Sequence, residues 1–158
     1  MLFRSVPVLR AISRCKDELI TPAAYRAEAE KALPAAASDD EREVAGKALE
    51  VAAIYEIYEE ELRKADAVDF GDLIMQSVRI LEQDDAIRSE YQARFEHVLV
   101  DEYQDVNLAS ARLLRALRGP GGDVWVVADQ RQSIYRFRGA EPSNVQRFES
   151  EFSERNAR

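Results

Sequence analysis

The sequence predicts a helix-rich α/β protein, in which a helical bundle is followed by a partial βαβ unit with two parallel strands. Two short apolar runs, residues 98–100 and 124–128, each lead into an acidic residue, as buried strands of parallel sheets do. A helical pattern lies between them, and the order strand, helix, strand favours a parallel pair with a right-handed crossover. Residues 1–94 show helical patterns and form the predicted bundle.

Local start and stop signals place the first helices. Thr21 followed by Pro22 is a typical helix start, with an N-cap hydroxyl and a proline at the first helical position. We expect this helix to end before Pro34, because a proline disfavours helical backbone at its predecessor. The segment Ser38–Glu41 fits a capping box and predicts a long helix over residues 41–64.

One face of this long helix is apolar. The spacing of three and four residues predicts a buried stripe made of Val44, Ala48, Val51, Tyr55, Tyr58 and Leu62. The tyrosines could instead stack on nucleic-acid bases, although this spacing is more typical of a core.

The next helix is expected to open at Asp69, with Asp69 as N-cap and Asp72 in the first turn. Its predicted buried face consists of Leu73, Ile74, Val78 and Leu81. A structural role is the simpler interpretation of the two aspartates, and a catalytic role is the alternative. Further along, Asn107 is expected to cap a helix, and Trp125 in the second strand is expected to lie in the core.

Composition excludes several classes of protein. The chain has 158 residues, a formal charge of −8, one cysteine and one histidine, so neither an intramolecular disulfide nor a zinc site can form within it. Cysteine usage favours a reducing cytoplasm. The negative charge argues against a protein that coats nucleic acid, but it allows a local basic patch. No apolar run is long enough to span a membrane.

Two adjacent carboxylates, Asp101 and Glu102, follow the first predicted strand. Ligands of open α/β sheets bind beyond the carboxyl ends of the strands. Mg²⁺ on nucleotide phosphates uses one or two carboxylates, and a second acid can orient or deprotonate an attacking water. The alternative is a strand that simply ends in two solvated acids.

A basic, aromatic segment follows the second predicted strand. Residues 131–147 contain four arginines and one glutamate, a local charge of +3. Tyr135 and Phe137 alternate there with Arg136 and Arg138, and such a mixture suits bases and phosphates of single strands. A half-exposed strand would show the same alternation.

These motifs resemble a known family. Residues 99–107 closely resemble the Walker B box (motif II) of superfamily-one DNA helicases of the UvrD/Rep type, and residues 132–140 resemble motif III of the same family. Residues 11–22 and 69–74 are similar to the family's helical accessory domain, 1B, and to its return to motor domain 1A. The resemblance implies an accessory region at residues 1–94 and a partial RecA-like motor region, of the P-loop NTPase type, at residues 95–158.

On the nucleotide side, the resemblance implies three roles. Asp101 would bind the Mg²⁺ of MgATP, Glu102 would activate the hydrolytic water, and Gln132 would sense the γ-phosphate and couple it to DNA. ATP and Mg²⁺ are the cofactors that it implies. Gln104 and Asp105 are expected to hold the loop between these groups.

On the nucleic-acid side, the resemblance implies single-stranded DNA as partner. Tyr135 and Phe137 would stack on its bases, and Arg138 would lie near the strand. The implied activity couples MgATP hydrolysis to translocation and duplex unwinding, in DNA repair or replication.

The sequence departs from the family pattern at three positions near these motifs, of which one is Ala128, where the family usually has a glycine. Arg131 stands where the family usually has an acid. Gly71 stands where the family usually has an aspartate, the third residue of its Asp-Phe-Asp-Asp-Leu motif. None of these changes removes a group with an implied catalytic role.

Larger parts of the family's motor have no counterpart in the sequence. It contains no Gly-x-x-x-x-Gly-Lys-Thr loop and nothing that resembles the second motor domain with its arginine fingers. We therefore expect a helicase fragment that is inactive alone and whose partners include the missing domains. Self-association through an exposed strand edge is a further expectation. The alternative is a truncated, non-enzymatic helicase-like module with weak DNA or protein binding.

Overall fold

The computed structural model describes residues 5–118, 122–129, 148 and 152. This part of the chain contains six α-helices, one short 3-10 helix and two strands. In chain order they are α1 (Ser5–Asp17), α2 (Pro22–Ala35), α3 (Asp39–Lys64), α4 (Phe70–Gln83), α5 (Asp85–Arg94), β1 (His97–Val100), η2 (Tyr103–Asp105), α6 (Leu108–Leu117) and β2 (Asp123–Val126). The predicted fold class is confirmed, because the chain is helix-rich and β1 pairs with β2 in parallel.

The chain packs as two compact units, Met1–Asp72 and Leu73–Arg158. These units are defined by packing, whereas the predicted boundary between residues 94 and 95 separates an accessory from a motor region. That boundary stays a prediction. None of the described helices is long and apolar enough to cross a membrane.

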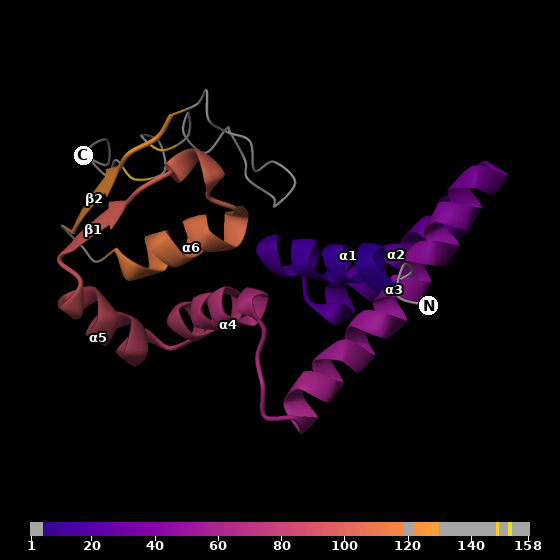
Figure 1. The fold of residues 1–158 in the computed structure, drawn as a ribbon, viewed down its shortest axis with the longest axis horizontal. Helices are drawn as coiled ribbons and strands as arrows, with labels where there is room; N and C mark the ends of the chain where they lie inside the picture. Colours follow the sequence, from indigo (N-terminus) through magenta and orange to yellow (C-terminus); the bar gives the residue numbers. More distant parts are fainter. Residues whose placement is uncertain (1–4, 119–121, 130–147, 149–151, 153–158) are drawn as a thin grey trace. The chain divides into compact units, whose positions relative to one another are not determined.

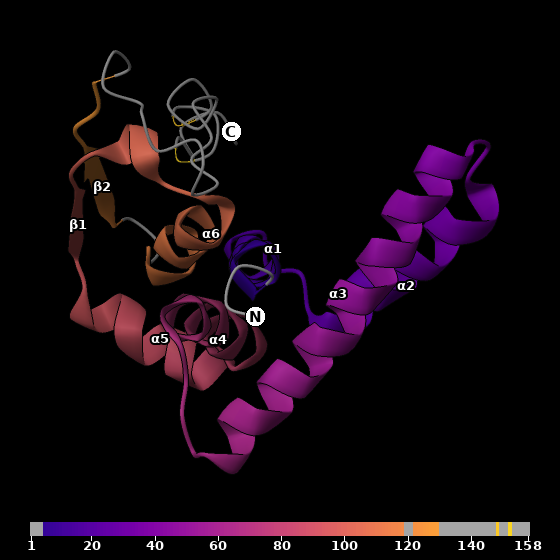
Figure 2. The same cartoon turned by 45° about the vertical axis from the view of Figure 1, so that its right-hand side comes forward.

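In the first unit, α2 and α3 form a hairpin, and α2 lies beside the first part of the longer α3 (Figures 1 and 2). The predicted caps are confirmed at both helix starts. Thr21 Oγ1 accepts a hydrogen bond from Ala24 N at 3.2 Å, and Pro22 occupies the first turn of α2. At α3, Ser38 and Glu41 form the reciprocal capping box, with both distances at 3.2 Å.

The predicted end of α2 before Pro34 is wrong, because the helix continues to Ala35 with Pro34 inside its last turn. A proline lacks the N–H that would bond four residues back, so it interrupts the helix ladder. In the last turn of a helix, the proline costs only this one hydrogen bond, because no further turns follow that it could disrupt. The chain leaves the helix two residues later, at Ala36, whose backbone is extended.

The predicted stripe on α3 is partly confirmed. Tyr55 is fully buried and packs in a core with Ile12 and Cys15 of α1, and its hydroxyl donates to Ile20 O at 3.2 Å. Val44, however, is 67% exposed, so its predicted burial is wrong. Its neighbours at the end of α2 are Ala32, Ala35 and Ala36, whose short side chains leave it uncovered.

A buried lysine ties α1 to α3 and to the start of α4. The Lys16 side chain is fully buried, and its Nζ lies near three carboxylates. The distances are 2.6 Å to Glu59, 2.8 Å to Asp69 and 2.8 Å to Asp72. Tyr58 completes this lysine clamp, because its hydroxyl donates to Asp69 at 2.8 Å and its ring lies 5.1 Å from Nζ. The structural interpretation of the two aspartates is consistent with these contacts.

The clamp shifts the acidity of its members. Burial alone would lower the pKa of Lys16, but hydrogen bonds to its carboxylate partners raise it above the ordinary value. Burial alone would raise the pKa of Asp69, but the hydrogen bond from Lys16 lowers it below its usual range. Burial, together with the bond to Asp69, raises the pKa of Tyr58 to about 12. Both partners of the Lys16–Asp69 pair are therefore charged at neutral pH.

The start of α4 follows the predicted cap, and Val78 and Leu81 are buried as predicted, but Leu73 is not. Asp69 Oδ1 accepts from Asp72 N at 2.8 Å, as expected of an N-cap. Leu73 is 54% exposed, whereas Met75 is buried. The clamp explains the difference, because its ion pair with Lys16 holds Asp72 on the buried face of the helix. Met75 and Val78, three and six positions later, lie on the same face and are buried as well.

In the second unit, α6 connects the two parallel strands and lies on one side of them in both views (Figures 1 and 2). Asn107 caps α6 as predicted, accepting from Ser110 N at 2.8 Å. The register pairs Leu99 with Trp125. These two residues therefore belong to the same face of the sheet.

That face is open to solvent in the described structure. Leu99 is 79% exposed, and Trp125 and Val127 are each 67% exposed. The predicted core position of Trp125 is wrong, because alternate residues of a strand point to opposite faces. Only the other face, with the half-buried Val98 and Val124, is on the inner side of the βαβ unit.

Candidate nucleotide-binding site

The two predicted acids lie at the carboxyl end of β1, as expected. β1 ends at Val100, and both Asp101 and Glu102 are exposed. Glu102 has φ 54° and ψ 40°, a left-handed backbone that costs a non-glycine residue about 1–2 kcal/mol. It leads directly into η2, where Asp105 N donates to Glu102 O at 2.9 Å. The chain thus reverses sharply beyond the strand and leaves both carboxylates accessible.

Backbone hydrogen bonds fasten this turn to the end of β2. Val127 N, one residue beyond β2, donates to the carbonyl oxygen of Val100, the last residue of β1, at 2.9 Å. Tyr103 N then donates to Val127 O, also at 2.9 Å. The turn after β1 and the chain after β2 therefore behave as one hydrogen-bonded edge.

A buried side chain adds a third connection between the two strand ends. Gln104 is 1% exposed, and its Nε2 donates to Glu102 Oε2 at 2.5 Å. Its Oε1 accepts from Asp129 N at 2.9 Å. The expectation that Gln104 holds this loop is consistent with these bonds. Its contact with Glu102 itself was not predicted, because a sequence contains no signal for the direction in which an amide turns.

Aromatic packing supports the turn. Tyr103 is fully buried, and its ring meets Phe148 edge to face with centroids 5.4 Å apart. Phe148 in turn contacts Phe152 at 5.0 Å, and Phe152 is buried. Phe148 therefore packs directly against the residue that follows the acid pair, and Phe152 packs against Phe148.

Asp101 fits the requirements of a Mg²⁺ ligand in a nucleotide site. Its Oδ1 accepts from Glu102 N at 2.9 Å, which orients the exposed carboxylate at the strand end. Mg²⁺ bound to nucleotide phosphates needs only one or two protein carboxylates. Within residues 5–118 and 122–129, no group of three or more His, Cys, Asp or Glu side chains is arranged to hold a metal ion.

The remaining predicted site residues, Gln132, Tyr135, Phe137 and Arg138, lie outside the described residues. The structure brings Asp101 and Glu102 together and joins them to Asp129, three positions before Gln132. The roles of the other four stay predictions.

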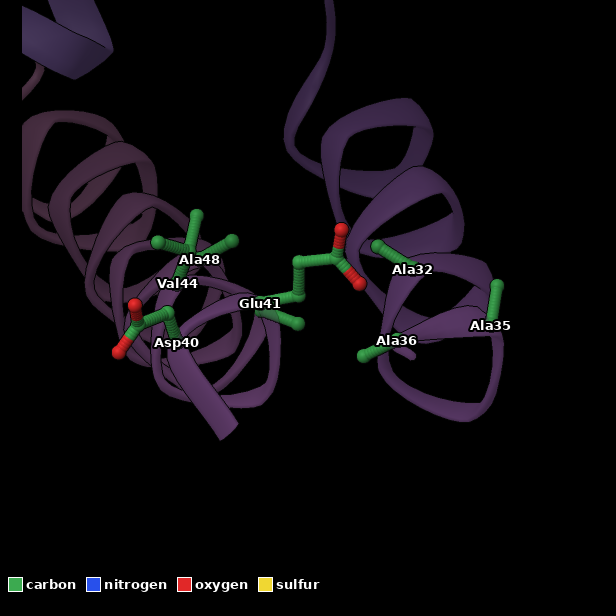
Figure 3. Close-up of a pocket in the computed structure, with 8 residues that line it drawn as sticks. Ala32, Ala35, Ala36, Asp40, Glu41, Val44 and Ala48 are labelled. Atoms are coloured by element: carbon green, nitrogen blue, oxygen red, sulfur yellow. The ribbon is translucent and has the colours of Figure 1, made fainter. Parts of the chain in front are cut away.

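A pocket of about 530 Å³ opens elsewhere, between α2 and α3 (Figure 3). Figure 3 shows the Glu41 side chain reaching from α3 toward the end of α2, where its carboxylate accepts from Ala37 N at 2.6 Å. Apart from Asp40 and Glu41, the lining is apolar: Ala32, Ala35, Ala36, Val44, Ala45 and Ala48. These side chains include no group that recognises a phosphate.

Comparison with protein families matches residues 3–153 to the UvrD/REP helicase N-terminal domain. The chain belongs to this family. The UvrD/REP match spans the acid pair, η2 and both strands, so the geometry described above lies within the family's own domain.

Individual relatives agree with this assignment. The chain is 42% identical over 149 residues to the ATP-dependent DNA helicase UvrD1 of Mycobacterium tuberculosis, covering 90% of this chain and 18% of UvrD1. It is 36% identical over 146 residues to the ATP-dependent DNA helicase PcrA of Staphylococcus aureus, covering 92% and 18%. It is 40% identical over 99 residues to DNA helicase II of Haemophilus influenzae, covering 63% and 14%. The chain therefore spans less than a fifth of the length of these relatives.

Proposed function

We propose that this UvrD/REP chain supplies the magnesium-binding and water-activating part of an ATP-dependent DNA helicase motor, with domains 1B and 1A meeting between residues 94 and 95. The observation that supports it best is the pair Asp101 and Glu102, exposed at the end of a parallel strand and fastened to the end of its neighbour. Family membership supports the same activity.

On the nucleotide side, Asp101 would hold Mg²⁺ together with the phosphates of ATP. When bound, the metal neutralises negative charge that develops on the phosphates. The Glu102 carboxylate, held by Gln104, would accept a hydrogen bond from the attacking water and take its proton. Gln132 would contact the γ-phosphate and couple its release to the residues that bind DNA.

On the DNA side, Tyr135 and Phe137 would stack on bases of a single strand, and Arg138 would lie near its backbone. Both this segment and Glu102 connect to the end of β2, the former through the chain and the latter through Gln104. Hydrolysis would thereby drive translocation on DNA and duplex unwinding in repair or replication.

The experiment that tests the nucleotide side uses the M. tuberculosis UvrD1 helicase with its matching segment replaced by this chain, here called the UvrD1 chimera. We expect ATPase activity that single-stranded DNA stimulates. Glu102→Gln should lower kcat by about 10²–10⁴-fold and leave ATP binding intact, because it removes a general base without changing size. Glu90→Gln, on the exposed surface of α5, is the matched control and should change neither.

Equal turnover of the Glu102→Gln and unsubstituted chimeras would remove Glu102 from its role. The 158-residue chain alone should show no ATPase activity above background, since its sequence lacks the phosphate-binding Gly-x-x-x-x-Gly-Lys-Thr loop and the arginine fingers.

The DNA side is tested in the same chimera with Phe137→Ala. The change should weaken single-strand binding by about 1–3 kcal/mol, the worth of one stacked base. Fluorescence anisotropy with a labelled oligonucleotide at fixed salt measures it. Phe95→Ala, at a ring that is 40% exposed after α5, is the control and should leave affinity unchanged. Equal affinities of the Phe137→Ala and parent chimeras would argue against stacking.

A further inference from the structure

The side-chain amide of Gln104 has only one chemically possible orientation. Asp129 N–H can only donate, so the Gln104 atom that faces it at 2.9 Å must be the carbonyl oxygen, Oε1. The NH₂ group is therefore turned toward Glu102, and it donates to a carboxylate oxygen that can only accept. The backbone at the end of β2 thus sets the direction of the donor that Glu102 meets.

Glu102 depends on this donor for its side-chain position. It is exposed on a left-handed turn, and within the described part of the chain its carboxylate accepts no hydrogen bond other than that from Gln104. Gln104 itself is buried and bonded at both ends of its amide. The fixed amide of Gln104 therefore restrains the Glu102 carboxylate, which would otherwise rotate freely in solvent.

We propose that Gln104 is a positioning residue for the hydrolytic step: it holds the Glu102 carboxylate in the orientation set by the end of β2, so that the carboxylate meets the attacking water. The inference rests on the proposed function of Glu102 and names a second residue that the same site requires. Gln104 touches no reacting atom, and its effect on turnover passes through Glu102.

The first test is Gln104→Met in the UvrD1 chimera. Methionine keeps the length and fills the buried site, but it can neither donate to Glu102 nor accept from Asp129. We expect kcat to fall on the order of 10²-fold, the effect of displacing a catalytic group by about 1 Å. The KM for ATP should change less than about 2-fold, because ground-state binding does not use Glu102.

A double-mutant cycle with Glu102→Gln separates positioning from general damage. If Gln104 acts through Glu102, Gln104→Met should cause no further loss of kcat once Glu102 is already replaced. Losses that multiply would instead show that Gln104 acts independently of Glu102, and they would overturn the proposal.

A second variant, Gln104→Glu, keeps the acceptor for Asp129 and the shape of the side chain. At neutral pH the introduced carboxylate repels Glu102, so kcat should fall as in Gln104→Met. As the pH is lowered, the introduced group becomes protonated and can donate again, and kcat relative to the parent chimera should recover. A constant ratio across the pH range would contradict the proposal, because loss of packing alone does not depend on pH in this way.

The matched control is Gln92→Met on α5. Like Gln104, Gln92 makes two side-chain hydrogen bonds, but it donates both from Nε2, to Ala116 O at 2.9 Å and to Arg118 O at 3.2 Å. It lies on α5, which does not carry the acid pair. Its substitution should leave kcat unchanged. If Glu102→Gln removes activity while Gln104→Met leaves kcat unchanged, the positioning role fails and the proposed function stands. If Glu102→Gln is itself fully active, the proposed function fails first.

Discussion

At the scale of single residues, the lysine clamp shows how much a buried charge depends on its partners. A fully buried ammonium is tolerated because Glu59, Asp69 and Asp72 surround it. No sequence pattern indicates this arrangement, since Lys16 is one basic residue in an ordinary amphipathic helix. Its partners lie 43 to 56 positions away along the chain, and only the fold brings them together.

Lys16→Met should therefore destabilise the chain strongly. It leaves three carboxylates close together without their cation, and we expect a loss of about 3 kcal/mol, at the low end for buried pairs because Glu59 and Asp69 still reach water. Urea unfolding followed by circular dichroism measures it. Lys31→Met, which removes an exposed pair with Glu28, is the control and should change the free energy of unfolding little. Equal effects of the two substitutions would contradict the clamp.

The same clamp predicts the pH dependence of stability. The pKa of Asp69 is lower in the folded chain than its unfolded value of 3.8, so its contribution is present above that pH and is lost as the pH falls below it. The raised pKa of Lys16 keeps its own contribution intact until strongly alkaline pH. Unfolding free energies measured from about pH 7 down to about pH 3 should fall less steeply in Lys16→Met than in the parent chain.

At the scale of elements, local chemistry predicted where helices begin, and tertiary packing decided the rest. Thr21, Ser38 and Asn107 cap helices as expected, because a cap requires only neighbours three positions away. The inward faces of α3 and α4 were less predictable. Val44 and Leu73 have the helical spacing of buried residues, yet the packing leaves both exposed.

Two helical glycines provide a matched test of this packing. An added Cβ at Gly71 would lie 2.8 Å from Lys16 Cδ and 2.9 Å from Lys16 Cβ, whereas at Gly46 in α3 no described atom lies within 4 Å. Gly46→Ala should stabilise the chain by about 0.5–1 kcal/mol through helix propensity. Gly71→Ala should destabilise it by about 1–3 kcal/mol, because the buried lysine cannot move aside easily. Thermal unfolding of both variants measures the difference, and a stabilising Gly71→Ala would disprove the close contact.

At the scale of the whole molecule, the open sheet face separates what sequence could predict from what it could not. The parallel βαβ unit and the acid pair at its end followed from pattern and chemistry. The exposure of Trp125 did not, because an apolar strand predicts burial whether or not the chain supplies a cover for both faces. In a complete helicase motor we expect further elements to cover this face.

Trp125→Ala tests the exposure directly. Burial of a tryptophan would make its truncation cost about 3–5 kcal/mol. At 67% exposure we expect a change in unfolding free energy of about 0.5 kcal/mol or less. Met75→Ala, at a smaller but buried side chain, is the comparison and should cost about 2–5 kcal/mol. Acrylamide should also quench the fluorescence of this single tryptophan efficiently, and strong protection would contradict the open face.

The left-handed turn at residue 102 has a consequence for anyone who optimises this chain by selection. Glycine adopts that backbone without penalty, so a screen for thermal stability alone would favour Glu102→Gly. If Glu102 has the proposed role, the variants that such a screen enriches at this position would be the ones that cannot support ATP hydrolysis in the UvrD1 chimera.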